Sequence, residues 1–345
     1  MFQLEKTQTP SDIPPQLAML QMVHSYWIFQ IVYAAAKLGI ADLLKNGPLS
    51  CDKLASSTGT HARSLYRLMR ALASVGVFAE NEQGDFTLTS LGDCLMSDVP
   101  NSIRAAAIML GEEHYRAWGD ILYSIRTGAS AFKHLYDLDV FQYYAQNPEP
   151  AKIFSEAMTS VSVIEDTAIA KGYDFSKIQK LVDVGGGHGS LIASILKSNP
   201  NMKGVLFDQH SVIEGAKHLL EKQGVSSRCE LVGGDFFQTV PAGGNAYILK
   251  HIIHDWDDER ALTILKHCYQ AMVENDLLLV VEQVIPPGNN PFMGKLHDIN
   301  MLIMSDCGCE RTEAEYRTLF ERAGFKLTKI FPTQSDANVI EGIRV

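Results

Sequence analysis

The sequence predicts an α/β protein with a mainly helical first part and a parallel β-sheet in its second part. Two observations predict this architecture: residues 19–96 follow a helical apolar period, and short apolar runs alternate with helical stretches from about residue 180. The chain has 345 residues, 46% of them hydrophobic, which is enough for two domains. We predict a helical domain over 1–100, a helical connecting region contributing to the substrate pocket over 101–179, and an α/β domain over 180–345.

The first part is predicted to contain a winged helix. In "LYRLMRALASVGVF" the apolar residues Leu65, Leu68, Met69 and Leu72 have the i, i+3, i+4, i+7 spacing of a helix with one buried face. The next stretch, "VFAENEQGDFTLTSLG", has two β-prone runs around a polar turn and predicts a hairpin. This pattern raises the alternative of DNA binding, but residues 1–100 contain seven Lys and Arg against nine Asp and Glu. Such a balance disfavours a phosphate-binding surface.

Charge and cysteine content narrow the range of partners. The formal net charge of −10 disfavours nucleic acid and anionic membranes, which attract clustered Lys and Arg, and favours a small molecule. The six cysteines form no CxxC pair, which is typical of reduced thiols in the cytoplasm. Residues 1–16 lack the basic start and apolar run of a secretory signal. The apolar stretch "YWIFQIVYAAA" is too short to cross a bilayer, and we predict that it forms a buried helix.

Five apolar runs predict the strands of the second part: "KLVDVGG", "KGVLFDQ", "CELVGGD", "NAYILKH" and "DLLLVVEQV". Helical stretches separate these runs, so they predict a parallel sheet, whose ligands bind at the carboxyl ends of the strands. Four acidic residues are predicted to start the helix after the fourth strand, because acidic residues in a first turn complement the helix dipole: Asp255, Asp257, Asp258 and Glu259.

The run "LVDVGGGHGSL" reads as a strand, a glycine loop and a helix start, which together let a backbone approach a nucleotide-like ligand. The dinucleotide pattern GxGxxG fails here, because counting from Gly185 puts Ser190 in the last position. Asp183, Gly185, Gly187 and Gly189 instead follow DxGxGxG, the pattern of methyltransferases that bind S-adenosylmethionine. We therefore predict S-adenosylmethionine, rather than NAD, as the cofactor.

The next two strand ends carry residues suited to the same ligand. Asp208 in "VLFDQ" is placed to accept hydrogen bonds from both ribose hydroxyls. In "GGDFF", Gly234 and Asp235 end a third strand, where Asp235 would accept from the adenine amino group and Phe236 would lie against the adenine ring. Three successive strand ends of this kind predict one ligand along a single edge of the sheet.

These segments, together with "LKHIIHDWDDE", "VVEQVI" and "GCERTEAEY", resemble the S-adenosylmethionine-dependent small-molecule O-methyltransferases. That family includes plant caffeic acid and isoflavone enzymes, acetylserotonin enzymes and bacterial polyketide enzymes. The resemblance covers nearly the whole chain. It implies a winged-helix dimerisation domain, a Rossmann-like catalytic domain and a homodimer.

The same resemblance implies the roles of individual residues. His254 would be the catalytic base, oriented by Glu282 and Glu310. The other implied residues contact the cofactor or the substrate: Met158, Ser162 and Lys250 for the cofactor, and Met301 and Ser305 for the substrate. By residue type alone, further candidates for lining an aromatic pocket are Trp118, Met109, Phe132 and Phe141.

The two histidines of "LKHIIHDW" raise the alternative of a metal site. Zinc sites on helices usually read HExxH, but Ile252 and Ile253 separate His251 from His254, and the sequence places no third ligand nearby. If the strand includes His251, the two rings would also point to opposite faces. A base has a clear task, because a phenol with a pKa of about 10 must lose its proton as its oxygen attacks, and histidine titrates in a suitable range. We predict a site without metal.

The predicted function is methyl transfer from S-adenosylmethionine to a hydroxyl of a small aromatic natural product. One alternative is a relative that performs decarboxylation or hydroxylation, and another is a winged-helix regulator that only senses S-adenosylmethionine. The set of His254, Glu282 and Glu310 favours an enzyme, because a regulator would not require a base. No residue combination in the chain matches one particular acceptor.

Overall fold

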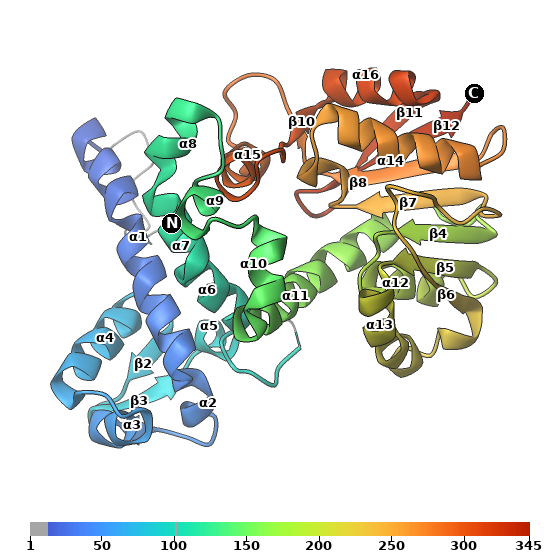
Figure 1. Cartoon of the computed structure of the whole chain (residues 1–345). Helices are drawn as coiled ribbons and strands as arrows, with labels where there is room; N and C mark the ends of the chain where they lie inside the picture. Colours follow the sequence, from blue (N-terminus) through green and yellow to red (C-terminus); the bar gives the residue numbers. More distant parts are fainter. Residues whose placement is uncertain (1–12, 101) are drawn as a thin grey trace. The chain divides into compact units, whose positions relative to one another are not determined.

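A computed structural model describes residues 13–100 and 102–345 (Figure 1). The prediction that no secretory signal is present concerns residues 1–16, of which residues 1–12 lie outside this description. Among the helices of the described ranges, none has the length and apolar character needed to span a membrane.

The chain forms two units. The first consists of the residues up to Tyr115 and Asn147–Val161, and the second consists of Arg116–Gln146 and Ser162–Val345. Helices α7 (Glu113–Gly119) and α11 (Pro148–Gly172) each contribute to both units. The helical region expected over 101–179 is therefore divided, because α6 packs on α1 whereas α8 and α9 pack on α15.

The first unit is helical with a small sheet. Its helices are α1 (Pro15–Leu38), α2 (Ile40–Leu44), α3 (Cys51–Thr58), α4 (Ala62–Ser74), α5 (Ser90–Asp93) and α6 (Arg104–Gly111), and its strands are β1 (Leu49–Ser50), β2 (Phe78–Glu80) and β3 (Asp85–Leu88). Strands β2 and β3 form the predicted hairpin, and β1 pairs with β3 on its other edge. On α4, the predicted stripe buries Leu65, Met69 and Leu72 in the core of this unit.

Helix α1 contains the apolar stretch that was predicted to be buried. Ala35 and Ala36 are buried, but the side chains of Tyr26 and Trp27 are 48% and 52% exposed. The exposed apolar side chains continue toward the start of the helix: Leu17, Met19, Leu20, Met22 and Val23. The prediction of burial is wrong for this part of α1, because no segment of the described chain covers its apolar face. The helix itself is confirmed.

The second unit is built on a seven-stranded sheet of order β11-β12-β8-β7-β4-β5-β6. Its strands are β4 (Lys180–Val184), β5 (Lys203–Asp208), β6 (Cys229–Gly233), β7 (Ala246–Lys250), β8 (Leu277–Glu282), β11 (Phe325–Pro332) and β12 (Asn338–Arg344). Strands β4 to β8 are parallel, and they are the five strands that the apolar runs predicted. Strands β11 and β12 add an antiparallel edge.

The remaining elements of this unit are short or lie on the faces of the sheet. They are α8 (Ile121–Thr127), α9 (Ala131–Tyr136), α10 (Val140–Gln146), α12 (Ser190–Ser198), α13 (His210–Lys222), η2 (Ser226–Arg228), η3 (Ile253–Asp255), α14 (Asp258–Ala271), β9 (Val284–Ile285), α15 (Met293–Met304), β10 (Arg311–Thr312) and α16 (Glu313–Ala323).

Helices cover both faces of the sheet, with α12 and α13 on one face and α14 and α16 on the other (Figure 1). Side chains alternate between the two faces along each strand, so Leu181 packs with α12 while Val182 packs on the opposite side. The chain runs from β4 to β5 and β6 and then crosses back to β7 on the other side of β4. Ligands of such sheets bind where the strand order reverses, at the carboxyl ends of the strands.

Candidate active site

The loop after β4 is shaped by its glycines. Gly185 and Gly187 have φ angles of 70° and 58°, in the left-handed region that side chains disfavour. A Cβ on Gly185 would lie 2.5 Å from the side chain of Ile252, so this position also has no room for one. A Cβ on Gly187 would meet no atom within 4 Å, which leaves space beside the loop. The loop leads into α12, whose amino terminus favours negative or hydrogen-bond-accepting groups.

Asp208 ends β5 beside this loop. Its Oδ2 accepts a 2.8 Å hydrogen bond from the backbone N–H of Gly187, and its Oδ1 accepts one of 2.7 Å from Gln209. Each carboxylate oxygen has a further lone pair available for a ligand. Asp208 therefore fixes the glycine loop as well as offering acceptors at its edge.

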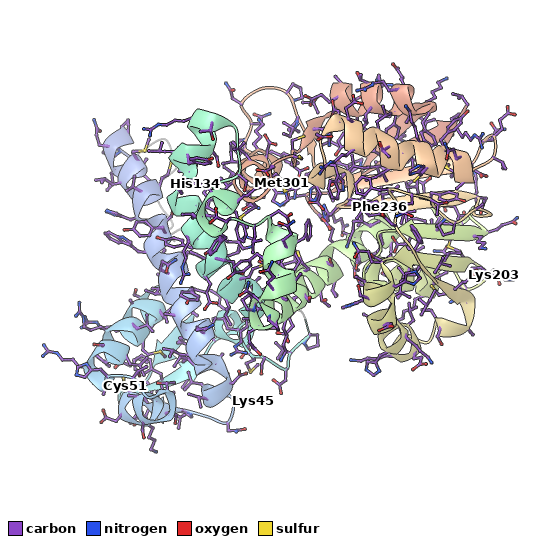
Figure 2. The ribbon with its side chains drawn as sticks, in the orientation of Figure 1. Lys45, Cys51, His134, Lys203, Phe236 and Met301 are labelled. Atoms are coloured by element: carbon purple, nitrogen blue, oxygen red, sulfur yellow. The ribbon has the colours of Figure 1, made fainter. Side chains whose placement is uncertain are left out.

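A cavity of about 710 Å³ lies at the ends of β5 and β6. Its lining is formed by Gln209, His210, Ser211, Gly234, Asp235, Phe237 and Gln238. The predicted Gly234 and Asp235 are part of this lining, and Phe237 lines it as well. The ring of Phe236 (labelled in Figure 2) is half-buried and packs edge-on against Phe237 and Trp256. A Cβ on Gly185 would lie 3.4 Å from Cε1 of Phe236, so this ring lies beside the glycine loop, and its contact with adenine stays a prediction.

Asp183 is the buried acidic residue at the end of β4. Within the part of the chain that the structure describes, its Oδ2 atom has no hydrogen-bond partner. Burial raises the pKa of Asp183 to about 7, although the charge of Lys250 lowers it and the charges of Asp166 and Asp208 raise it. A carboxyl group with a free buried oxygen fits a ligand that carries positive charge, as S-adenosylmethionine does.

Lys250 ends β7 and is held by acidic residues of α11. Its Nζ forms an ion pair with Asp166 and lies 3.9 Å from Glu165. Asp166 also accepts a 2.6 Å hydrogen bond from the hydroxyl of Ser190, at the start of α12. The sequence analysis did not single out Glu165 or Asp166, although both follow Ser162 on the helix that was predicted to reach the cofactor.

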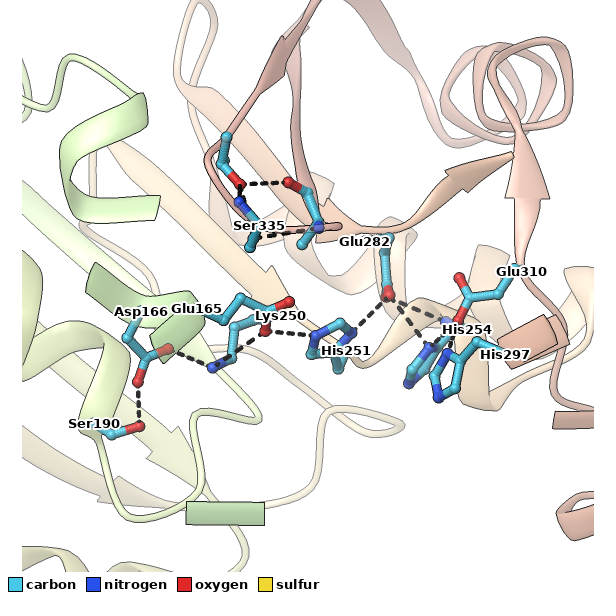
Figure 3. Close-up of polar contacts among 12 residues, drawn as sticks. Glu165, Asp166, Ser190, Lys250, His251, His254, Glu282, His297, Glu310 and Ser335 are labelled. Atoms are coloured by element: carbon cyan, nitrogen blue, oxygen red, sulfur yellow. Dashed lines mark hydrogen bonds and ion pairs between the residues drawn. The ribbon is translucent and has the colours of Figure 1, made fainter. Parts of the chain in front are cut away.

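His254, Glu282 and Glu310 lie together, as predicted from the sequence (Figure 3). His254 is in η3, Glu282 ends β8, and Glu310 precedes β10. The Nδ1 atom of His254 is 2.8 Å from Oε1 of Glu310 and 3.4 Å from Oε2 of Glu282. Oε1 of Glu282 also accepts hydrogen bonds from the backbone N–H groups of Ile253 and His254, at 2.9 and 3.2 Å. One carboxylate therefore orients the ring and the other fixes the backbone that carries it.

The charges of this group shift its pKa values. Burial alone would lower the pKa of His254, but Glu282, Glu310 and Asp255 together raise it to about 9, against an opposing effect of His251. Burial would raise the pKa of Glu310, but its hydrogen bonds with two histidines lower it to about 2. At neutral pH Glu310 is therefore a carboxylate that can stabilise a proton on His254.

The predicted geometry of His251 is wrong. Strand β7 ends at Lys250, and His251 has a φ of 52°, which turns the chain so that its ring stacks on that of His254 with 5.1 Å between centroids. Glu282 lies between the two histidines, so a third group is also present, contrary to the sequence argument. Each histidine is hydrogen bonded to a carboxylate, as in a base with its orienting groups. The absence of a metal requirement stays a prediction.

His297, on α15, was missed by the sequence analysis. Its Nδ1 lies 2.8 Å from the same Glu310 oxygen that binds His254, and the rings of His254 and His297 are 5.6 Å apart. One feature of the sequence could have indicated His297: its helical spacing from Met301 and Met304 puts the three residues on one face of α15.

The three residues that were predicted to bind the substrate lie on or beside α15. Met301 on α15 (Figure 2) is buried, and Trp118 donates a 3.0 Å hydrogen bond to Asn300 of the same helix. Ser305 ends α15, where its hydroxyl accepts from the backbone of Cys307 and Gly308. The residues that were proposed by residue type alone differ in their exposure. Phe132 is fully buried in a hydrophobic core, Phe141 is exposed, and Met109 is buried in the first unit.

Two residues of α11 were predicted to contact the cofactor. Met158 belongs to the first unit and is 39% exposed, whereas Ser162 begins the part of α11 that belongs to the second unit. Their contacts with the cofactor stay predictions.

Comparison with known proteins gives matches along most of the chain. Residues 118–326 match the O-methyltransferase domain, and residues 20–98 match the O-methyltransferase dimerisation domain. The chain is 44% identical to phenazine O-methyltransferase PhzM of Lysobacter antibioticus, over 95% of this chain and 96% of that protein. It is 31% identical to phenazine-1-carboxylate N-methyltransferase of Pseudomonas aeruginosa, over 97% of this chain and 99% of that protein.

Solved structures also match over most of the chain. The crystal structure of LaPhzM has a TM-score of 0.92 at 43% identity and covers 96% of this chain and 100% of its own. The O-methyltransferase NcsB1 from neocarzinostatin biosynthesis was solved with S-adenosylmethionine and 2-hydroxy-5-methyl naphthoic acid. It has a TM-score of 0.79 at 31% identity, over 92% of this chain and 96% of its own.

Proposed function

The chain belongs to the O-methyltransferase family and is an S-adenosylmethionine-dependent methyltransferase of the natural-product type. From that premise we propose that it methylates a hydroxyl of a small aromatic natural product, with His254 as the general base. The hydrogen bond of 2.8 Å between buried His254 and buried Glu310 carries this proposal, because it gives an imidazole one nitrogen held by a carboxylate and one nitrogen left to accept a proton.

S-adenosylmethionine, when bound, supplies an electrophilic methyl group on a positively charged sulfur. The residues that would hold it are the strand-end groups: Asp183, Gly185 and Gly187 after β4, Asp208 after β5, and Gly234 and Asp235 after β6. The free buried oxygen of Asp183 suits a cation, and the acceptors of Asp208 and Asp235 suit hydroxyl and amino donors. Lys250, Ser162, Met158 and Phe236 remain proposed as supporting contacts.

His254 would remove the proton of the acceptor hydroxyl as its oxygen attacks the methyl carbon. Donation from Nδ1 to Glu310 fixes the tautomer that leaves Nε2 as the acceptor. Glu282 holds the N–H of His254 and so fixes the position of the ring. Both carboxylates then stabilise the imidazolium that the proton transfer creates, which general-base catalysis requires.

The aromatic acceptor is supported by the relatives and by residue type. Two relatives are a phenazine O-methyltransferase and a 3-amino-4-hydroxybenzoate 4-O-methyltransferase, and both of these named acceptors are aromatic. Around α15, half-buried Trp118 and buried Met301 offer the apolar and aromatic contacts that flat rings favour. We propose Met301, Trp118 and Ser305 as substrate-binding residues.

Methyl transfer to nitrogen is the second candidate, because one relative is named as an N-methyltransferase. A ring nitrogen that lacks a hydrogen attacks through its lone pair and needs no base. The pairing of His254 with Glu310 would then have no task in the reaction. The pair therefore favours an acceptor that must lose a proton, such as a phenol.

A screen with S-adenosylmethionine carrying an isotopically labelled methyl group tests the proposal. A library of phenols and aromatic amines is incubated with the protein, and products are identified by mass spectrometry. We expect the label on a phenolic oxygen, and we expect His254→Gln to lower that rate strongly. Label on nitrogen with full activity of His254→Gln would favour the second candidate. A product that loses its carboxyl group or gains oxygen without label would overturn both.

A further inference from the structure

A chain of buried and half-buried polar contacts links the glycine loop of the cofactor site to the proposed base (Figure 3). It runs from Ser190 through Asp166 to Lys250, then to Glu165, His251, Glu282 and His254, all within the second unit. The proposed mechanism uses Glu282 and His254 but gives no task to His251 or Glu165.

His251 lies between two carboxylates. Its Nε2 is 2.7 Å from Oε2 of Glu165, and its Nδ1 is 3.3 Å from Oε2 of Glu282. A neutral imidazole has only one N–H, so one carboxylate would then face a nitrogen lone pair. Only the imidazolium form donates to both. The geometry therefore favours the imidazolium form of His251.

The pKa agrees with this geometry. Burial would lower the pKa of His251, but its hydrogen bonds to Glu165 and Glu282 raise it to about 10. Burial would raise the pKa of Glu165, yet its contacts with His251 and Lys250 lower it. At neutral pH the pair is an imidazolium and a carboxylate.

His254 has the opposite requirement, because a base must be unprotonated. Three carboxylates face it: Glu282 from β8, Glu310 from the segment before β10, and Asp255, whose Oδ1 is 3.6 Å from Nε2. Each of them favours the protonated ring. From α15, His297 shares the Glu310 oxygen, and from the end of β7 the ring of His251 stacks on His254. His251 is thus a cation placed where it opposes protonation of the base.

We propose that His251 is a positioning residue: an imidazolium, held between Glu165 and Glu282, whose positive charge opposes protonation of the neighbouring His254 and so favours its proton-accepting form. The proposal rests on the assignment of His254 as the base. Glu165 acts one step further away, because its carboxylate holds the proton on His251.

The first test compares the pH dependence of kcat/KM, with the acceptor found in the labelled-methyl screen, in three variants. His251→Asn removes the charge and keeps a residue type that tolerates the left-handed φ of 52°. His251→Lys restores a charge at the same place. His218→Asn makes the same substitution on the exposed surface of α13 and is the matched control.

For His251→Asn we expect the rising limb of the profile to move about 1–2 pH units higher, which is the size expected of one charge at this separation. The rate at high pH should stay within about threefold of the wild type, because the base itself is intact. In His251→Lys and His218→Asn, the rising limb of the pH profile should lie within about half a pH unit of its wild-type position. If His251→Asn lowered kcat/KM equally at every pH, a purely structural role would explain the loss and the proposal would be overturned. If the rising limb of its pH profile did not move, His251 would have no effect on the base, and the proposal would be overturned as well.

A second measurement does not depend on activity. Nitrogen-15 NMR of labelled imidazoles reports the protonation of each ring, with His251→Asn used to assign the signal. We expect His251 to remain an imidazolium from pH 6 to about 9 in the wild type, and to lose its proton at lower pH in Glu165→Gln. A neutral His251 at pH 7 would overturn the proposal even if His254 proved to be the base. An imidazolium at His251 together with full activity of His254→Gln would instead show that the assigned base, and the inference that rests on it, is wrong.

Discussion

At the scale of single residues, His254 and Asp208 have different proposed roles, one in the chemical step and the other in cofactor binding. Nδ1 of His254 is hydrogen bonded to Glu310, whereas the side chain of Asp208 accepts hydrogen bonds from the glycine loop and from Gln209. Replacing one residue should therefore change the chemical step, and replacing the other should change cofactor binding.

We expect His254→Gln to lower methyl transfer by at least about a hundredfold, because general-base catalysis contributes about 10²–10⁴-fold and glutamine cannot take the proton. The affinity for S-adenosylmethionine, measured by calorimetry, should be nearly unchanged. Asp208→Ala should show the reverse pattern, with weaker binding as the main effect. Near-normal turnover of His254→Gln on a phenol would remove His254 from the reaction.

Removal of metal ions should leave turnover unchanged. The proposed site contains a histidine base with orienting carboxylates, each already hydrogen bonded to another member of the group, rather than a set of oxygen ligands around one point. The measurement is the rate after EDTA treatment and dialysis, with magnesium added back as the control. A rate that falls with EDTA and returns with magnesium would contradict the prediction.

The raised pKa of His251 also predicts how stability depends on pH. Its folded value of about 10 lies above the usual value of 6.5, so its contribution is complete below the unfolded pKa and is lost as pH rises through the folded pKa. The difference in Tm between wild type and His251→Asn should therefore shrink between pH 6.5 and about 10. Thermal unfolding followed by circular dichroism measures this. A constant difference would mean that His251 carries no bound proton in the folded state.

The sequence predicted that His254, Glu282 and Glu310 act together, and the structure brings them together, but their surroundings were only partly predicted. His254, Glu282 and Glu310 belong to short motifs that follow apolar strands, so their positions could be expected. The carboxylate of Glu165 is different, because only the packing of α11 brings it to His251, 86 residues away. The turn at His251 could not be predicted from the sequence either, because an apolar run does not indicate at which residue the strand ends and the φ angle becomes positive.

At the scale of elements, Arg311 connects β10 with η3. Its guanidinium donates to the backbone oxygens of Ile253 and Trp256, at 3.0 and 2.8 Å, and to the carboxylate of Asp258. The residue is almost completely buried and follows directly after Glu310. Arg311 therefore fixes the segment that carries His254 relative to the segment that carries its orienting carboxylate.

We expect Arg311→Lys to lower both Tm and kcat, because a lysine cannot donate to all three acceptors in fixed directions. Hydrogen bonds of charged groups contribute about 1.5–3 kcal/mol each, so the loss of even one lowers Tm by several degrees. Arg317→Lys, at an exposed ion pair on α16, is the control and should change neither value. An unchanged kcat in Arg311→Lys would show that η3 is held in place without this residue.

The elements themselves were predictable where the sequence signal is local. Strands β4 to β8 follow from apolar runs, and α14 begins where expected, with Asp257 as its cap accepting from the N–H of Arg260. The buried position of Arg311 depends on packing between distant segments, which the pattern along the chain does not contain.

At the scale of the whole molecule, the apolar face of α1 needs a partner. Among the exposed apolar side chains of the first unit, those near the start of this helix form a continuous set, and Met22 is 70% exposed. The match to the dimerisation domain covers residues 20–98 and so includes the exposed side chains from Leu20 to Trp27. The domain and the exposed face together support a homodimer.

We expect sedimentation velocity to show a dimer at micromolar concentration. The double variant Met22→Lys with Trp27→Lys should sediment as a monomer, because it places two charges within the apolar face. Val273→Lys, at an exposed apolar residue of the second unit, is the control and should remain a dimer. A dimer in the double variant would locate the interface elsewhere.

The path of the chain between its two units limits how the protein can be divided. The boundary is crossed after Tyr115, after Gln146 and after Val161, and two of these crossings lie inside helices α7 and α11. A fragment that begins at Ser162 would lose residues 116–146 of its own unit and would cut α11 just before Glu165 and Asp166. A hybrid in which the whole second unit of a relative is joined at a single point of the chain is therefore expected not to fold. Hybrid proteins that test substrate choice should instead exchange surface-exposed side chains or complete segments such as α8 to α10.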